Sequence, residues 1–236
     1  MQLGLPKIVR CPFCGRDKKL LGLRSGNNFG ADEWSDQKVI APMLPRVSFV
    51  QKCHKCGRYY LLSRQKERYA RKGFCFYLGT LNYAEMVEAF HQLAAEGFEN
   101  IKEECRVRVL LLHTFNDEFM REESRRNNTP EQPSETERQL MDQNIHWLIE
   151  NWASNDLIKA ELYREAGHME KALELLETFE CAEGGFRSLV KDEIIRRAKA
   201  NDQTVFETTG MRQQAHEHAR NLAREQMKSQ KGESNN

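Results

Sequence analysis

The sequence predicts an α+β protein, in which a small β-rich module is followed by an antiparallel all-α domain. Two Cys-x-x-Cys pairs stand near the start, and short runs of β-branched and aromatic residues flank them. From about residue 82 the apolar residues recur with helical spacing instead. The charge also divides along the chain: residues 1–75 carry 16 Lys and Arg against 5 Asp and Glu, and the remaining residues carry 20 against 30.

These observations predict a basic domain at residues 1–72, a helical domain at 73–228 and a disordered tail at 229–236. In the first domain, residues 7–10 are expected to lead into the first cysteine pair as a strand. Residues 47–50 are expected to lead into the second pair, and residues 59–62 to leave it. The 38 residues between Cys14 and Cys53 exceed the roughly 15–20 that usually separate two such pairs. The loop between them therefore carries an elaboration, with Trp34 as its expected anchor.

The helical domain is predicted from its caps and apolar faces. Asn82 with Glu85, and Ser134 with Glu137, have the spacing of capping boxes. The expected apolar faces are Tyr83, Met86, Phe90 and Leu93, then Ile101, Cys105, Leu112, Phe115 and Phe119, then Met141, Ile145, Leu148 and Trp152. Further helices are expected near 156–166, 169–180, 186–200 and 211–228. The polar stretch 122–136 is the expected mobile linker.

Four cysteines in two pairs supply the ligand set of a closed, tetrahedral, structural Zn²⁺ site. The glycine after each pair can adopt a positive φ, which lets backbone amides turn toward the thiolates. The predicted metal ligands are Cys11, Cys14, Cys53 and Cys56, holding one Zn²⁺. The alternatives are a redox dithiol, which would need a βαβ context that is absent, or a relic of a former site. His54 is expected to face solvent, and Cys75, Cys105 and Cys181 to be packing residues.

The first module resembles the bacterial zinc ribbons of the Cys-Pro-x-Cys-Gly type over residues 7–63. The resemblance rests on the cysteine pairs together with Pro12, Gly15 and Gly57, and the second pair lacks the proline. It implies a three-stranded ribbon with zinc at one end and no catalytic role for the metal.

Part of the helical domain resembles one tetratricopeptide repeat, over about residues 155–180. In that motif a small residue and a tyrosine on the first helix fit against an alanine on the second, around a turn glycine. Ala160, Tyr163, Gly167 and Ala172 have this spacing. The alternative is an ordinary helical hairpin, since only one repeat is visible and a stable array needs about three.

A basic patch surrounds the cysteine pairs, with tyrosines interleaved. Cations can neutralise phosphates while aromatic rings stack on bases, so nucleic acid is one candidate partner. The cations concerned are Arg16, Lys18, Lys19, Lys55, Arg58, Arg64, Lys66, Arg68 and Arg71, and the tyrosines are Tyr59, Tyr60 and Tyr69. The alternative is that these charges solvate the module or dock it on its own acidic helices.

The sequence therefore predicts a non-catalytic, zinc-binding protein that acts as a macromolecular interaction or adaptor module with a protein partner. The alternative is a nucleic-acid-binding protein that uses the basic ribbon. An enzyme ranks last, because the chain has no phosphate-binding Gly-rich loop, no Gly-x-Ser-x-Gly and no His-Glu-x-x-His. No catalytic residue or organic cofactor is predicted. With no apolar run near 18 residues and no signal-peptide pattern, a cytoplasmic location without membrane contact is expected.

Overall fold

The computed structural model describes residues 1–121 and 132–233, with side chains described up to residue 225. It divides into two compact units, the first formed by residues 1–31 and 39–152 and the second by residues 32–38 and 153–236. The units do not follow the expected boundary after residue 72, since the helices up to residue 152 belong with the cysteine pairs. The expected linker at 122–136 falls mostly on residues 122–131, which lie outside the described residues.

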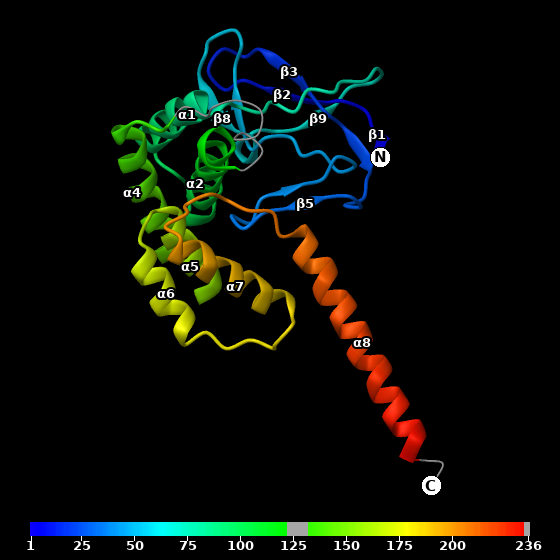
Figure 1. The fold of residues 1–236 in the computed structure, drawn as a ribbon. Helices are drawn as coiled ribbons and strands as arrows, with labels where there is room; N and C mark the ends of the chain where they lie inside the picture. Colours follow the sequence, from blue (N-terminus) through cyan, green and yellow to red (C-terminus); the bar gives the residue numbers. More distant parts are fainter. Residues whose placement is uncertain (122–131, 234–236) are drawn as a thin grey trace. The chain divides into compact units, whose positions relative to one another are not determined.

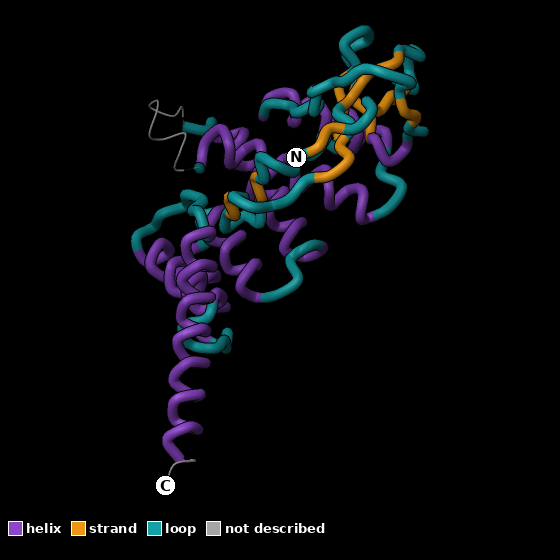
Figure 2. The backbone as a smooth tube through the Cα atoms, turned by 90° about the vertical axis from the view of Figure 1, so that its right-hand side faces the viewer, coloured by secondary structure: helices purple, strands orange, loops and turns teal. Residues whose placement is uncertain are grey.

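Short antiparallel strands make up the β-rich part of the first unit, near the N-terminus (Figures 1 and 2). β2 (Lys7–Arg10) lies between β3 (Asp17–Leu20) and β9 (Arg68–Tyr69) in a three-stranded sheet. β7 (Val50–Lys52) pairs with β8 (Tyr59–Leu61) as a separate hairpin. The remaining strands are β1 (Gln2–Leu3), β4 (Leu23–Ser25) and β6 (Val39–Ile40), and the 3₁₀ turn η1 (Leu62–Arg64) follows β8.

An apolar core joins the sheet to the hairpin. Val9 of β2 and Leu20 of β3 are fully buried, and Tyr60 of β8 packs with them. Cys11 and Cys53 belong to the same cluster. The expected strand at 47–50 begins only at Val50, whereas the expected strand at 7–10 is confirmed.

The helices of the first unit are α1 (Tyr83–Glu96), α2 (Ile101–Phe115) and α4 (Glu135–Asn151), with a π-helical turn η2 (Asn116–Met120) after α2. Both expected capping boxes are confirmed, at Asn82 and at Ser134. The rings of Tyr83, Phe115 and Phe119 form a cluster with centroids 5.1–5.5 Å apart. Ile101 is 54% exposed, contrary to expectation, because α2 begins at this residue and Asn100 caps it.

The second unit contains β5 (Asp32–Glu33) and the helices α5 (Asp156–Glu165), α6 (Met169–Glu177), α7 (Phe186–Lys199) and α8 (Thr209–Glu233). These four helices were expected to within a few residues. Ala160 and Ala172 are both fully buried in one core cluster, so α5 and α6 form a close helical hairpin. The expected tail at 229–236 is a continuation of α8 as far as Glu233, and residues 234–236 lie outside the described residues.

The elaboration between the cysteine pairs belongs to this second unit. The backbone N–H of Ser35 donates to Phe206 O at 2.9 Å, and the N–H of Thr208 donates to Glu33 O at 2.7 Å. Trp34 is 5% exposed and forms an isolated antiparallel bridge with Glu207. Trp34 is therefore an anchor, as expected, but it fixes residues 32–38 within the C-terminal unit.

Candidate metal centre

The two cysteine pairs lie on turns with the same backbone geometry. In the first turn Gly15 N–H donates to Cys11 O at 3.0 Å, and in the second Gly57 N–H donates to Cys53 O at 2.8 Å. The glycines have φ values of +71° and +73°, a left-handed conformation that strains residues with a Cβ. The first turn connects β2 to β3 and the second connects β7 to β8. Two separate hairpins therefore present equivalent thiol pairs.

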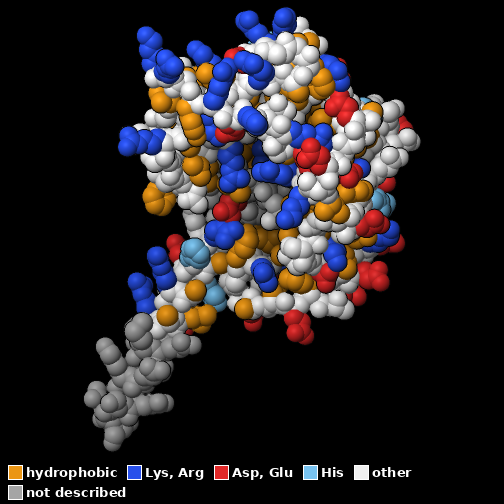
Figure 3. Space-filling view, turned by 180° about the vertical axis from the view of Figure 1, so that it is seen from behind, with side chains coloured by type: hydrophobic (Ala, Val, Ile, Leu, Met, Phe, Trp, Pro, Cys, Tyr) orange, Lys and Arg blue, Asp and Glu red, His pale blue; other side chains and the backbone are white. Residues whose placement is uncertain are grey.

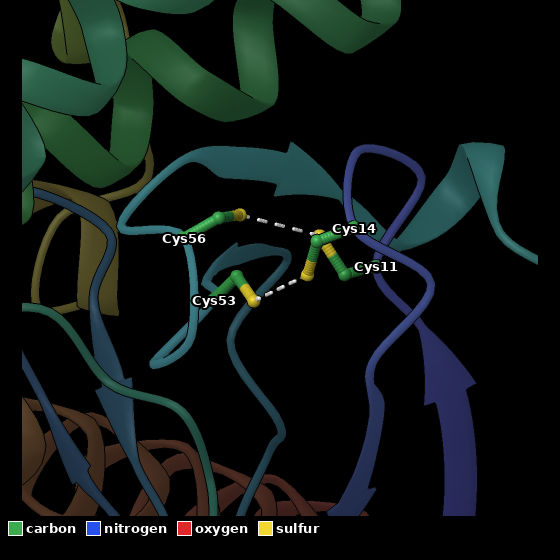
Figure 4. A group of neighbouring side chains, drawn as sticks. All are labelled: Cys11, Cys14, Cys53 and Cys56. Atoms are coloured by element: carbon green, nitrogen blue, oxygen red, sulfur yellow. Dashed lines mark hydrogen bonds between the residues drawn. The ribbon is translucent and has the colours of Figure 1, made fainter.

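The structure brings all four predicted ligands together. Their sulfur atoms lie within 4.8 Å of one another, and the side chains of both turns converge on one point (Figure 4). Cys11 Sγ lies 3.7 Å from Cys56 Sγ, and Cys14 Sγ lies 3.6 Å from Cys53 Sγ. A tetrahedral ion with metal–sulfur bonds of about 2.3 Å places its sulfurs about 3.8 Å apart. All four cysteines are free thiols, so the donor set and the spacing fit a metal ion.

Backbone amides favour ionisation of one thiol in this cluster. Burial opposes ionisation of Cys53, but N–H groups of Cys56 and Lys55 directed at its sulfur lower its pKa to about 6. Burial raises the pKa of Cys11 to about 11, against the effect of the amides of Cys14 and Phe13. A cation at the centre would favour the thiolate form of every cysteine. The amides of the second turn therefore favour the thiolate form of Cys53.

Lys18 is a buried cation beside the thiols. Its side chain is 5% exposed, and Nζ donates to Lys52 O, the carbonyl preceding Cys53, at 2.8 Å. Nζ also lies 4.6 Å from the centroid of the Tyr77 ring. Burial lowers the pKa of Lys18, and the Cys53 thiolate acts in the opposite direction. Because Lys18 is on β3 and Lys52 is on β7, this hydrogen bond joins the two cysteine-bearing hairpins.

Tyr60 adds a second buried donor near the sulfurs. Its side chain is 3% exposed, and its hydroxyl has no hydrogen-bond partner among the described residues. Burial raises its pKa, and negative charge on Cys11 and Cys53 raises it further, so the hydroxyl stays protonated. A neutral O–H beside four thiolates is an electrostatically suitable neighbour for an anionic metal–sulfur cluster.

The tips of the two turns are also joined. The guanidinium carbon of Arg58, two residues after Cys56, lies 3.5 Å from the centroid of the Phe13 ring. The same guanidinium donates to Glu96 Oε1 of α1 at 2.7 Å. A cation stacked on an aromatic face contributes about 0.5–1 kcal/mol at an exposed site. Arg58 thus links both turns to helix α1.

Helix α1 binds the second cysteine hairpin through one polar face. Gln92 accepts from the backbone N–H of Tyr59 at 3.0 Å and donates to its carbonyl at 2.9 Å. Tyr59 Oη donates to Glu88 at 2.7 Å, and Lys52 Nζ donates to Glu85 at 3.0 Å. Residues 85, 88, 92 and 96 follow the helical repeat, so they lie along one stripe. The β7–β8 hairpin and α1 are consequently one structural assembly.

A further ion pair fixes the chain that leaves this hairpin. Arg64 donates through Nε and Nη2 to the carboxylate of Glu103 on α2, which is 5% exposed. Ser63 Oγ donates to the same carboxylate at 2.9 Å. The Arg64 hydrogen bond lowers the pKa of Glu103, and burial acts against it. The pair therefore remains charged at neutral pH.

The cations of the expected basic patch differ in whether they form ion pairs with carboxylates. Lys18 is buried, which corrects its place in that patch. Arg58, Arg64 and Arg68 form ion pairs with Glu96, Glu103 and Asp17 respectively. The exposed patch members with no carboxylate partner among the described residues are Arg16, Lys19, Lys55, Lys66 and Arg71. Tyr59 and Tyr60 are 4% and 3% exposed, so neither can stack on a base, and Tyr69 alone of the three is open, at 64%.

Sequence reasoning found the cysteines but missed the groups around them. Lys18 was expected in the exposed basic patch. Successive side chains of a strand point to opposite faces, so Lys18 shares the buried face of β3 with Leu20, and Asp17 and Lys19 share the exposed one. Cys75, expected to be a buried packing residue, is half-buried, and its Sγ donates to Lys19 O at 3.5 Å. His54 is exposed, as expected. Gln92 carries no sequence signal for its contact with Tyr59.

The comparisons with known proteins place the chain in no family. No protein-family model matches it, and no curated protein or solved structure matches it significantly. Within the part of the chain that the structure describes, no helix is both long and apolar enough to cross a membrane. What the protein does must therefore be argued from the site itself.

Proposed function

We propose that this chain is a non-catalytic zinc-binding protein, in which one Zn²⁺ on Cys11, Cys14, Cys53 and Cys56 fixes a module for macromolecular interaction. The observation that supports this best is the sulfur geometry, with separations of 3.6 and 3.7 Å that match a tetrahedral edge of about 3.8 Å. Zinc suits four thiolates and this geometry better than Ca²⁺ or Mg²⁺, which take oxygen ligands.

The ion would supply folding free energy rather than chemistry. Four sulfur ligands leave no position for water or substrate, so the chain's own residues have structural roles. The two glycine turns orient the thiols, Lys18 offsets thiolate charge, and Arg58 couples the turns to α1. A thiolate site of this kind implies a reducing compartment, consistent with a cytoplasmic location.

The adaptor role is supported by the helical unit. Ala160 and Ala172 meet in its core, and Gly167, with φ +84°, makes the turn between α5 and α6. Tyr163 packs against this core as the tetratricopeptide-like pattern requires. A stacked helical hairpin can present a protein-binding face to a partner.

Metal content tests the zinc assignment. Protein purified reduced and without chelator should carry one zinc per chain by elemental analysis, and Cys56→Ser should lose most of it. Cys75→Ser is the matched control, since this thiol lies outside the cluster, and should keep its zinc. Absence of zinc from the native chain, or a disulfide between the pairs in its place, would contradict the proposal.

A further inference from the structure

The segment after β9 exposes aromatic rings to an unusual extent. Phe74 is 72% exposed and Phe76 is 53% exposed, and Tyr69 at the end of β9 is 64% exposed. Aromatic side chains are usually buried, because burial removes their apolar surface from water. Exposed rings that follow one another along a short stretch of chain are typical of a binding surface rather than of a folded core.

This segment lies against the sheet that carries the first cysteine pair. Leu21 N–H, just after β3, donates to Tyr77 O at 2.8 Å, and Cys75 Sγ donates to Lys19 O at 3.5 Å. Cys75 thus contacts β3, while its neighbours Phe74 and Phe76 are open to solvent. The segment has neither helix nor strand at these positions, and Tyr77, which follows Phe76, is also 45% exposed.

An exposed aromatic ring can stack on a nucleic acid base, because every base has a flat π-face. Bases in a duplex are already stacked and paired, so a single strand offers these faces more readily. The exposed rings of Phe74 and Phe76 therefore favour an unpaired base as the occupant.

Exposed cations precede the two rings in the chain, and another stands on the strand that the segment contacts. Arg71 and Lys72 directly precede Phe74, and Lys19 is joined to the segment through Cys75. All three are exposed, and no carboxylate among the described residues pairs with them. Figure 3 shows a face of the molecule on which Lys and Arg side chains gather with apolar side chains between them. Charge complementarity thus points to a polyanion.

We propose that this aromatic–basic surface (Lys19, Tyr69, Arg71, Lys72, Phe74 and Phe76) binds single-stranded nucleic acid. Phe74 and Phe76 stack on an unpaired base, and the three cations contact adjacent phosphates. A duplex is a poor ligand, because its bases are already stacked and paired. This inference rests on the proposed role as an interaction module, and it names the partner class of that module.

The test is fluorescence anisotropy of the full-length, zinc-loaded chain with labelled 20-nucleotide oligo(dT) and oligo(U). Both single strands should bind, and a duplex of equal length should bind at least tenfold more weakly. With three phosphate contacts, log affinity should fall with log salt with a slope of about −2, at roughly 0.7 per contact. The Arg71→Gln/Lys72→Gln variant should reduce that slope by about 1.4.

Variants of the rings separate stacking from apolar contact. Loss of one stacked base is worth about 1–3 kcal/mol, so Phe74→Ala/Phe76→Ala should weaken binding about tenfold or more. Phe74→Leu/Phe76→Leu keeps apolar area but removes the rings, and should weaken binding similarly. Phe29→Ala is the matched control: Phe29 is 80% exposed elsewhere on the chain, and its replacement should leave affinity unchanged.

Three results would overturn the inference. These are no binding of either oligonucleotide at micromolar protein in low salt, equal affinity of the Phe74→Ala/Phe76→Ala variant, and binding to vesicles of phosphatidylserine and phosphatidylcholine instead of the oligonucleotides. Zinc content measured on the same samples distinguishes the two proposals. Full zinc without oligonucleotide binding overturns this inference alone, whereas absence of zinc overturns the proposed function.

Discussion

Lys18 places a buried positive charge near Cys53, one of the four clustered cysteines. Its ammonium is buried, so it has lost most of its water and depends on Lys52 O and the face of Tyr77. A buried charge without compensation is costly, and a metal centre with four thiolates carries a net charge of −2. In the proposed zinc-bound state, the lysine would therefore offset part of the negative charge of the thiolates.

Replacement of Lys18 by Met should weaken zinc binding. The change removes the compensating charge and leaves Lys52 O without its donor, and a buried unsatisfied group costs about 1–3 kcal/mol. The zinc dissociation constant, measured by chelator competition, should rise about tenfold. Lys19→Met, on the exposed side of the same strand, is the control and should bind zinc as the native chain does. Unchanged zinc affinity in both variants would show that Lys18 does not contribute to zinc binding.

Ionised Glu103 should stabilise the first unit, and this contribution to its free energy of unfolding should be lost at acidic pH. Arg64 lowers the pKa of Glu103 in the folded state, so this group's contribution is present above its unfolded pKa, near 4.3. It is lost as pH falls through the lower folded pKa. Glu103→Gln should therefore lose less unfolding free energy than the native chain as pH falls from about 5 toward 3, measured by urea titration.

Glu99→Gln is the control for Glu103. Glu99 also pairs with Arg64, at 3.5 Å, but it is 66% exposed. Its charge is screened by solvent, so the pH dependence of this variant should match that of the native chain. The same dependence in Glu103→Gln and the native chain would show that the buried pair does not matter.

At the scale of elements, the sequence predicts where helices begin but not which other elements of the chain they contact. A cap is a local pattern, and Asn82 with Glu85 signals it within four residues. The contact of Gln92 with Tyr59 joins residues that are 33 positions apart in the chain. Because any glutamine can form such hydrogen bonds, the sequence does not indicate that this one does. The sequence therefore does not show that α1 packs against the second cysteine hairpin, which places both in the first compact unit.

The α5–α6 turn depends on a glycine conformation. Gly167 has φ +84°, and a Cβ there would clash with the side-chain amide of Gln203. Gly167→Ala should destabilise the second unit by about 1–3 kcal/mol, seen as a lower midpoint of thermal unfolding. Gly210→Ala, in α8 with no heavy atom near its Cβ position, should be neutral or slightly stabilising. Equal midpoints for both variants would contradict this role of the turn.

At the scale of the whole molecule, the chain does not divide where its composition changes. The cysteine pairs, α1, α2 and α4 form one compact unit, and residues 32–38 leave the inter-cysteine loop to join the C-terminal helices. The meeting of the four cysteines was predictable because two Cys-x-x-Cys pairs have the spacing of a four-sulfur site. The place of residues 32–38 in the second unit could not be predicted. It depends on backbone hydrogen bonds, such as that from Ser35 to Phe206, which residues of any type can form.

Removal of the metal should loosen the first unit and spare the second. Without the ion, the metal–sulfur bonds that would join the two hairpins are lost, and α1 loses the ordered hairpin to which Gln92 and Glu96 bind. After chelation, hydrogen exchange of α1 amides should accelerate about tenfold or more. Amides of α7 should stay protected, because Val190 and Ile194 lie in a separate core. Equal loss of protection in α1 and α7 would mean that both units depend on the metal.

The central claim is that four sulfurs hold one zinc ion, and X-ray absorption at the zinc edge tests it most directly. Four zinc–sulfur bonds should give one distance of about 2.3 Å to four sulfur scatterers, with no nitrogen or oxygen contribution. Cys56→Ser should alter that coordination shell, and Cys75→Ser should leave it unchanged. A shell containing nitrogen or oxygen in the native chain, or a purified reduced protein without zinc, would contradict the account.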